Sequence, residues 1–97
     1  MSEVQLRLDD DGRGAFEIRE GSEVIGEMVI SVRHASLIAH HTGVIERAKG
    51  QGLADKLFKA MVDYAREHKL KVAPRCAYVD ARFKRHPAEY ADIWSKD

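Results

Sequence analysis

Arg47-Ala48-Lys49-Gly50-Gln51-Gly52-Leu53-Ala54 is the stretch that decides the fold of this chain. A β-branched, apolar segment precedes it, and an amphipathic helical pattern follows it. Gly50 and Gly52 let the backbone approach a ligand without a Cβ, and the first amide N–H groups of the helix have no partner within it. Such amides, together with the helix dipole, stabilise an anion. We therefore predict a cradle for a pyrophosphate; a tight turn before a helix is the alternative, because Gly-x-Gly alone is weak evidence.

Size and charge limit what the chain can be. Its 97 residues, 44% of them hydrophobic, fit a single domain spanning residues 1–97. Lys plus Arg and Asp plus Glu number 16 each, so no basic field exists to bind nucleic acid or a membrane surface without specificity. Asp9-Asp10-Asp11 precedes Gly12 in hairpin position, which favours a turn over a metal site. We expect no metal, no nucleic acid and no membrane partner.

Cys76 is the single cysteine, so the chain has no internal disulfide. No apolar leader and no apolar segment of membrane length is visible. These two observations predict a cytoplasmic protein whose thiol is kept reduced.

Four strand patterns precede the glycine loop. Val4–Leu8 and Ala15–Arg19 alternate apolar and polar residues on either side of an Asp/Gly turn, as in a β-hairpin. Glu23–Arg33 continues this alternation, and Ser36–Ile45 is a fourth strand candidate. Successive strands without intervening helices predict an antiparallel meander.

The hydrophobic period changes to that of a helix after the glycine loop. This helix is expected to end near residues 68–69, and Leu70–Ala73 follows as a short strand. We predict a second helix at Tyr78–Arg85 and a short terminal turn of helix at Ala88–Trp94. The apolar positions that define the first helix are Ala54, Leu57, Phe58, Met61, Val62 and Ala65.

The loop lacks the Gly-Lys-Ser/Thr of a P-loop, and antiparallel strands rather than a βαβ unit come before it. ATP and NAD are therefore disfavoured as ligands. The stretch Arg47 to Gly52 matches the Gln/Arg-x-x-Gly-x-Gly/Ala signature of the GNAT superfamily of acetyltransferases, which the chain resembles. The closest resemblance is to a small, stand-alone GNAT-like subfamily, because His41-Thr42, Pro74-x-Cys76 and Arg85-His86-Pro87 also recur there.

The resemblance implies a minimal GNAT-like α/β fold: a mostly antiparallel mixed sheet, one main helix and short C-terminal helices. It also implies acetyl-CoA as cofactor, with the CoA pyrophosphate on the backbone amides of residues 50–54 and the pantetheine beside a strand edge. Arg47 and Lys49 would add local positive charge. The chain departs from the subfamily pattern at Gly43, where an acidic residue is common, and at Ile45, where proline is common. The implied cofactor-binding residues are Thr42, Gly43, Val44, Arg47, Lys49, Gly50, Gln51, Gly52, Leu53 and Ala54.

Two residues are candidate catalytic groups. Cys76 follows the strand that would part from its neighbour near the thioester, so it would either accept the acetyl group as a thioester or line the acetyl pocket. A lone cysteine is otherwise most often a small buried hydrophobe. His41 is the candidate general base, and an edge-strand or core histidine bonded to the backbone is the equal alternative. A regular strand would turn His40 to the opposite face.

Other residues carry weaker signals. Tyr78 follows the same short strand and would protonate the departing thiolate, as tyrosines do in related enzymes, or simply pack. Arg82, Lys84 and Arg85 would either meet a CoA phosphate or form a solvated helix face, which is the usual role of a run of charges. Tyr90, Ile93 and Trp94 are expected to seal the core.

The function implied is acetyl transfer from acetyl-CoA to an unknown amine or protein acceptor, with Cys76 as a candidate intermediate carrier. The chain begins directly with a hairpin, where larger GNAT enzymes have helices that wall the acceptor site. A non-catalytic acetyl-CoA binding or sensing module is therefore the alternative, and a plain interaction domain is a third. An exposed strand edge is compatible with either a monomer or a homodimer.

Overall fold

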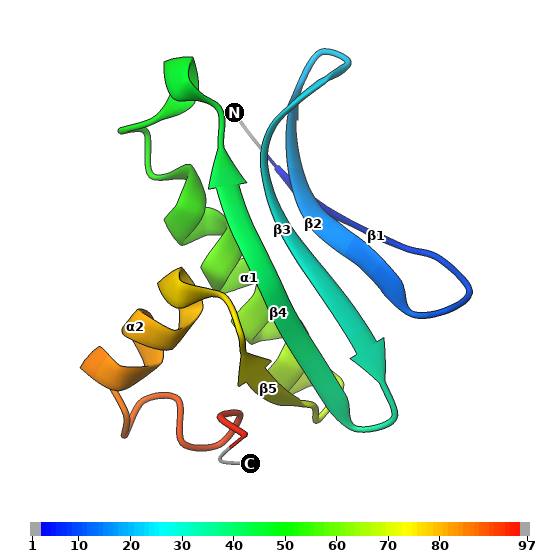
Figure 1. Cartoon of the computed structure of the whole chain (residues 1–97), viewed down its shortest axis with the longest axis vertical. Coiled ribbons are helices and arrows are strands. Elements are labelled where there is room, and N and C mark those ends of the chain that lie inside the picture. Colours follow the sequence, from blue (N-terminus) through cyan, green and yellow to red (C-terminus); the bar gives the residue numbers. More distant parts are fainter. Residues whose placement is uncertain (1–2, 96–97) are drawn as a thin grey trace.

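A computed structural model describes residues 3–95 and contains one five-stranded sheet with strand order β1-β2-β3-β4-β5. Four strands form the predicted antiparallel meander, and the fifth pairs in parallel with β4 (Figure 1). The mixed sheet and the α/β class are as expected from the sequence. The strands are β1 (Val4–Leu8), β2 (Arg13–Glu20), β3 (Glu23–Arg33), β4 (Ser36–Val44) and β5 (Lys71–Pro74).

A bulge interrupts β4 at the two histidines. Val29 pairs with His41 and Ile30 pairs with Ala39, so the register shifts by one residue and His40 is the extra residue. His40 bonds through its ring nitrogen to the Ser31 hydroxyl, 2.8 Å away, on the face of the sheet that also carries Val29. The prediction that His40 and His41 face opposite ways was wrong, because it assumed a regular strand.

Helix α1 (Leu53–Glu67) connects β4 to β5 and covers one face of the sheet (Figure 1). Its apolar positions are those that the sequence period predicted, with Leu57, Phe58 and Met61 fully buried. They pack on the core face of the strands, where Met28 and Ile30 are also fully buried. Because the strand after α1 runs parallel to the strand before it, α1 serves as a crossover connection.

Helix α2 (Ala77–Arg85) packs on the same core through Val79 and Phe83, and Phe83 lies edge-on to Phe58 of α1 at a centroid distance of 5.9 Å. Both helices therefore lie on one side of the sheet. Among residues 3–95, no helix covers the opposite side, which we call the outer face; it is the side toward the viewer in Figure 1.

The segment Ala88–Trp94 does not form the predicted turn of helix and consists mainly of turns. The reason is that its backbone is used by β5: Val72 donates to the Ile93 carbonyl at 2.6 Å, and Ser95 donates to the Val72 carbonyl at 2.8 Å. Tyr90 and Ile93 are nevertheless buried, as expected, and Trp94 packs partly buried against them.

Strands β4 and β5 diverge halfway along β4. Their pairing ends at Ala39 and Pro74, and the amide of Cys76 makes a last bond to the Ala39 carbonyl at 2.8 Å before the chain turns into α2. Strand β4 continues to Val44 (Figure 1). A gap between diverging strands therefore lies just below the start of α1.

Candidate functional site

The loop before α1 has the backbone geometry that an anion cradle needs. Gly50 and Gly52 both adopt left-handed backbone conformations, with φ of 85° and 77°, and Gly52 is the N-cap of α1. No side chain of the described residues caps this end, and the first backbone bond into the helix is from Lys56 to the Gly52 carbonyl. Within residues 3–95 no backbone carbonyl accepts from the amides of residues 50–55. The positive end of the helix dipole is thus open to an anion.

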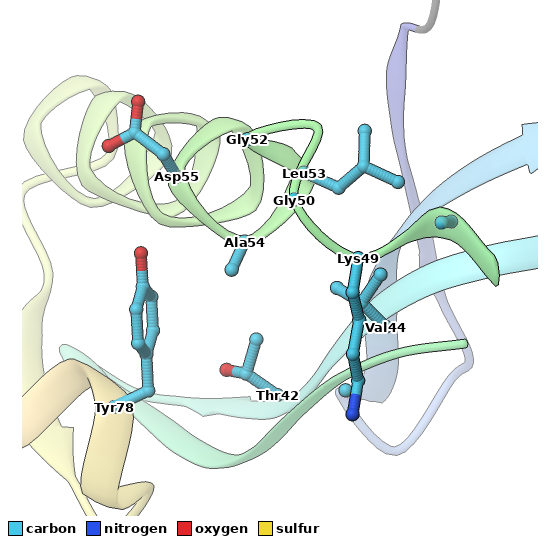
Figure 2. Close-up of a pocket in the computed structure, with 11 residues that line it drawn as sticks. Thr42, Val44, Lys49, Gly50, Gly52, Leu53, Ala54, Asp55 and Tyr78 are labelled. Carbon is cyan, nitrogen blue, oxygen red and sulfur yellow. The ribbon is translucent and has the colours of Figure 1, made fainter. Parts of the chain in front are cut away.

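A cavity of about 410 Å³ extends from this cradle to the free part of β4. In Figure 2, Thr42 and Tyr78 rise toward Ala54 in the first turn of α1, and Lys49 lies at the other end. A Cβ added at Gly50 or Gly52 would meet no atom within 4 Å, so the space beside these residues is open. The lining residues are Thr42, Gly43, Val44, Ala48, Lys49, Gly50, Gly52, Leu53, Ala54, Asp55 and Tyr78.

The free part of β4 offers backbone groups to this cavity. Ile45 donates to the Ile25 carbonyl of β3, so Gly43, two residues earlier, also directs its backbone groups toward β3. Thr42 and Val44 alternate with these residues, and their N–H and C=O groups point the other way, into the gap. This is an unpaired strand edge that an extended chain with amide groups can join.

The charges near the cradle are already paired. Arg47 bonds to Glu20 at 2.8 Å and to Glu23, both at the β2–β3 turn, and does not line the cavity. The hydrogen bond to Glu20, followed by that to Glu23, raises the pKa of the Arg47 guanidinium above its ordinary value. Lys49 lines the cavity but lies 3.2 Å from Glu46. The local positive charge expected from Arg47 and Lys49 is therefore paired with glutamates, whereas the open end of α1 faces the cavity.

Cys76 lies where the chain leaves β5, at the N-cap of α2, and is only 6% exposed. Its sulfur is 3.2 Å from the hydroxyl oxygen of Thr42, which itself lines the cavity. The two motifs His41-Thr42 and Pro74-x-Cys76, distant in sequence, thus meet through Thr42 and Cys76 at the gap between the strands.

His41 does not lie at the contact between Thr42 and Cys76. It pairs with Val29 on the outer face, whereas Thr42 pairs with Met28 on the core face. Its ring lies over Gly43, since a Cβ there would be 3.2 Å from its Nε2 atom. His41 and Cys76 are therefore on opposite sides of β4, and Gln51, although in the cradle loop, is exposed and does not line the cavity.

The structure adds a polar group that the sequence pattern did not identify. One nitrogen of Arg82, Nη1, donates to the Tyr78 hydroxyl at 2.8 Å and to Asp55 at 2.9 Å, and the guanidinium lies 4.2 Å from the Phe58 ring centroid. Arg82 is thus turned inward, only 20% exposed, rather than standing on a solvated face. The spacing of Tyr78 and Arg82, four residues apart on one helix, was the available signal.

The ionised forms of Asp55 and Arg82 stabilise one another. The hydrogen bond from Lys59, at 3.1 Å, and that from Arg82 lower the pKa of the Asp55 carboxyl against the effect of burial. For Arg82, burial works against the charge, but bonds to Asp55 and Tyr78 raise the pKa of the guanidinium.

Two kinds of site are not formed by the described part of the chain. Residues 3–95 contain no group of three or more His, Cys, Asp or Glu side chains placed to hold a metal ion. Over the same residues, neither helix has the length and apolar character needed to cross a membrane.

Comparison with known proteins identifies the family. The model for the GCN5-related N-acetyl-transferase family matches residues 15–93. A GCN5-like protein from Staphylococcus aureus superposes with a TM-score of 0.69 and 27% identity over 98% of this chain and 91% of that one. A ribosomal-protein-alanine N-acetyltransferase from Brucella melitensis biovar Abortus 2308 shares the fold, with a TM-score of 0.60 and 18% identity over 92% of this chain and 68% of that one. A search of curated proteins gave no match. The chain is a small, GNAT-like protein and belongs to the GCN5-related N-acetyltransferase family.

Proposed function

We propose that this protein binds acetyl-CoA in the 410 Å³ cavity and transfers its acetyl group to an amine. One observation carries the proposal: the uncapped N-terminus of α1 and the unpaired edge of β4 open into the same cavity. The first suits a pyrophosphate and the second suits the amide groups of pantetheine. Membership of the acetyltransferase family supports the same ligand.

The residues present fit the parts of this ligand. The amides of residues 50–54 would hold the pyrophosphate, and Thr42, Gly43 and Val44 would run beside the pantetheine. Bound acetyl-CoA supplies an acetyl group activated as a thioester. We place that group at the cavity end near Thr42, whose hydroxyl oxygen is 3.2 Å from the Cys76 sulfur and which lies where β4 and β5 diverge.

Two routes of transfer are compatible with this placement. In the direct route, an amine attacks the acetyl carbon, the C–S bond breaks, and the amine loses a proton to a base. In the covalent route, the Cys76 thiol loses its proton and its sulfur attacks the acetyl carbon, and the C–S bond to CoA breaks so that CoA leaves as the thiol. The amine then attacks the Cys76 thioester, and breakage of that bond releases the thiol of Cys76. His41 suits an amine that reaches the gap from the outer face, because it lies on that face beside Gly43.

A second candidate is a non-catalytic module that binds or senses acetyl-CoA. It is favoured by the separation of His41 from Cys76 across β4 and by the absence, within residues 3–95, of a helix on the outer face to wall an acceptor site. It predicts binding without acetyl transfer.

The test is to add acetyl-CoA to the pure protein and record melting temperature and intact mass together. A hundredfold excess of ligand over its dissociation constant should stabilise the fold by about 3 kcal/mol. A gain of one acetyl group that disappears in Cys76→Ser would support the covalent route. Stabilisation without mass gain leaves the direct route or sensing, which a screen of amine acceptors separates. If acetyl-CoA changes neither quantity, the ligand assignment is wrong.

His41 can be tested against its neighbour. If His41 is the base, His41→Gln should lower the rate of acetyl transfer by about 100-fold, the usual contribution of a positioned base. His40→Gln is the matched control, because His40 lies on the same face but bonds to Ser31. Equal rates for the two variants would remove His41 from the mechanism.

A further inference from the structure

Tyr78 is held in the cavity wall by one guanidinium. Arg82 Nη1 donates to the Tyr78 hydroxyl oxygen at 2.8 Å and forms an ion pair with the Asp55 carboxylate, 2.9 Å away. Tyr78 and Asp55 both line the cavity, from α2 and α1 respectively. Arg82 therefore connects the two helices that form the cavity.

The chemistry of arginine fixes the direction of the Tyr78 proton. A guanidinium only donates hydrogen bonds, so the phenol oxygen of Tyr78 must accept from Arg82. Its own O–H proton is then left for another acceptor, and no group among residues 3–95 takes it. Since Tyr78 lines the cavity, this proton is available to a ligand there (Figure 2).

Arg82 is itself fixed in place. Its guanidinium stacks over the Phe58 ring, a fully buried side chain, and Asp55 is bound in turn by Lys59 at 3.1 Å. A planar guanidinium held by a ring and by a carboxylate has little freedom to rotate, unlike a lysine ammonium. The orientation of the Tyr78 hydroxyl is thus set before any ligand binds.

We propose that Arg82 is a positioning residue: it directs the Tyr78 hydroxyl proton into the cavity, toward the sulfur of a bound coenzyme A thioester. This inference rests on the proposed function. In the transfer, the new bond to the acetyl carbon forms as the C–S bond breaks, and Tyr78 gives its proton to the departing sulfur. The proton lost by the acceptor leaves through its base to solvent, and the Tyr78 phenolate takes a proton back from solvent.

The experiment compares the binding of CoA and of desulfo-CoA, which lacks the sulfur, by calorimetry at alkaline pH, where the thiol ionises. Wild type should bind CoA about fivefold more tightly than desulfo-CoA, the usual strength of one hydrogen bond. Tyr78→Phe and Arg82→Met should each abolish this preference, and the double variant should lose no more. Arg85→Met, an exposed arginine on the same helix, should keep it.

Arg82→Lys provides a second variant if Arg82→Met does not fold. It keeps the charge beside Asp55 but not the planar donor, so the preference should still be lost. A preference kept in either folded Arg82 variant, or absent from wild type, would overturn the positioning role. Failure of both CoA and desulfo-CoA to bind any of these proteins would instead overturn the proposed function.

Discussion

Gly52 has a backbone conformation that strains other residues, and it lies at the helix end where a side chain would block an anion. Its φ of 77° is a conformation that other residues adopt only with strain, and it stands at the open end of α1. We expect Gly52→Val to lower acetyl-CoA affinity more than about tenfold by filling the space through which a phosphate reaches the amides, and to cost about 1–3 kcal/mol of stability through backbone strain. Isothermal calorimetry and urea unfolding measure the two effects.

Gly21 offers the matched control. It also has a positive φ, 64°, and open space around its Cβ position, but it lies in the β2–β3 turn and does not line the cavity. Gly21→Val should therefore be destabilised to a similar extent while binding acetyl-CoA as wild type does. Similar affinity losses in the two variants would mean that strain, and not the cradle, explains the result.

At the level of single residues, the sequence predicts backbone sites better than side-chain partners. The spacing of Gly50 and Gly52 is a local property, and both residues adopt the left-handed backbone conformation that favours glycine. Arg47 instead bonds to Glu20, 27 residues away in sequence, which no local pattern signals. Arg82 turns inward for the same kind of reason, because its partner Asp55 is on another helix.

Within β2, one buried acid makes the stability of the sheet depend on pH. Glu17 is only 7% exposed and lies 3.1 Å from both Arg7 and Arg19. Burial raises the pKa of the Glu17 carboxyl, but the hydrogen bonds from the two arginines outweigh it, and the net shift is downward. The stabilisation is therefore present above the ordinary value of 4.5 and is lost as pH falls through the lower folded value.

Glu17→Gln should accordingly reduce the free energy of unfolding by about 1 kcal/mol at pH 7, since both arginines are largely exposed and solvent screens them. The difference from wild type should shrink as the pH is lowered below 4.5. Urea unfolding at several pH values measures it. Glu27→Gln is the control, because Glu27 lies opposite Glu17 on β3. A loss of unfolding free energy in Glu17→Gln that does not change with pH would contradict the ionic explanation.

At the level of elements, the hydrophobic period predicted all five strands and both helices, with bounds that agree with the structure to within two residues. It failed at Ala88–Trp94, where the helical spacing of Tyr90, Ile93 and Trp94 reflects burial in a chain of turns whose backbone bonds to β5. It also missed the bulge at His40 and His41, because the shift in register depends on the pairing with β3 and not on β4 alone.

Over the whole molecule, positive and negative charges balance, and the cations of the cradle loop are locally paired. Acetyl-CoA should therefore be held mainly by amides rather than by free cations. We expect its affinity to change less than about threefold between 50 and 300 mM NaCl, and Arg47→Met to change it less than about twofold. Calorimetry at the two salt concentrations tests both values, and a steep salt dependence would indicate that Arg47 leaves its glutamates to bind the ligand.

The sequence does not specify the acceptor of the acetyl group. Residues 3–95 form one sheet and one layer of helices, and the cavity lies between these elements. The outer face, where an amine would approach His41, carries no helix within residues 3–95, so no helix side chains there indicate a substrate.

The parallel pairing of β4 with β5 bears on how the protein folds. Strands β1 to β4 join neighbours through short turns, whereas Ser36 must find Lys71 across the whole of α1. Contacts so distant in sequence close slowly and form after the local ones. The gap at which β4 and β5 diverge is then among the last parts to assemble. A ligand seated there should leave the folding rate almost unchanged and act by slowing unfolding, so that its benefit to the cell would be a longer lifetime of the native state.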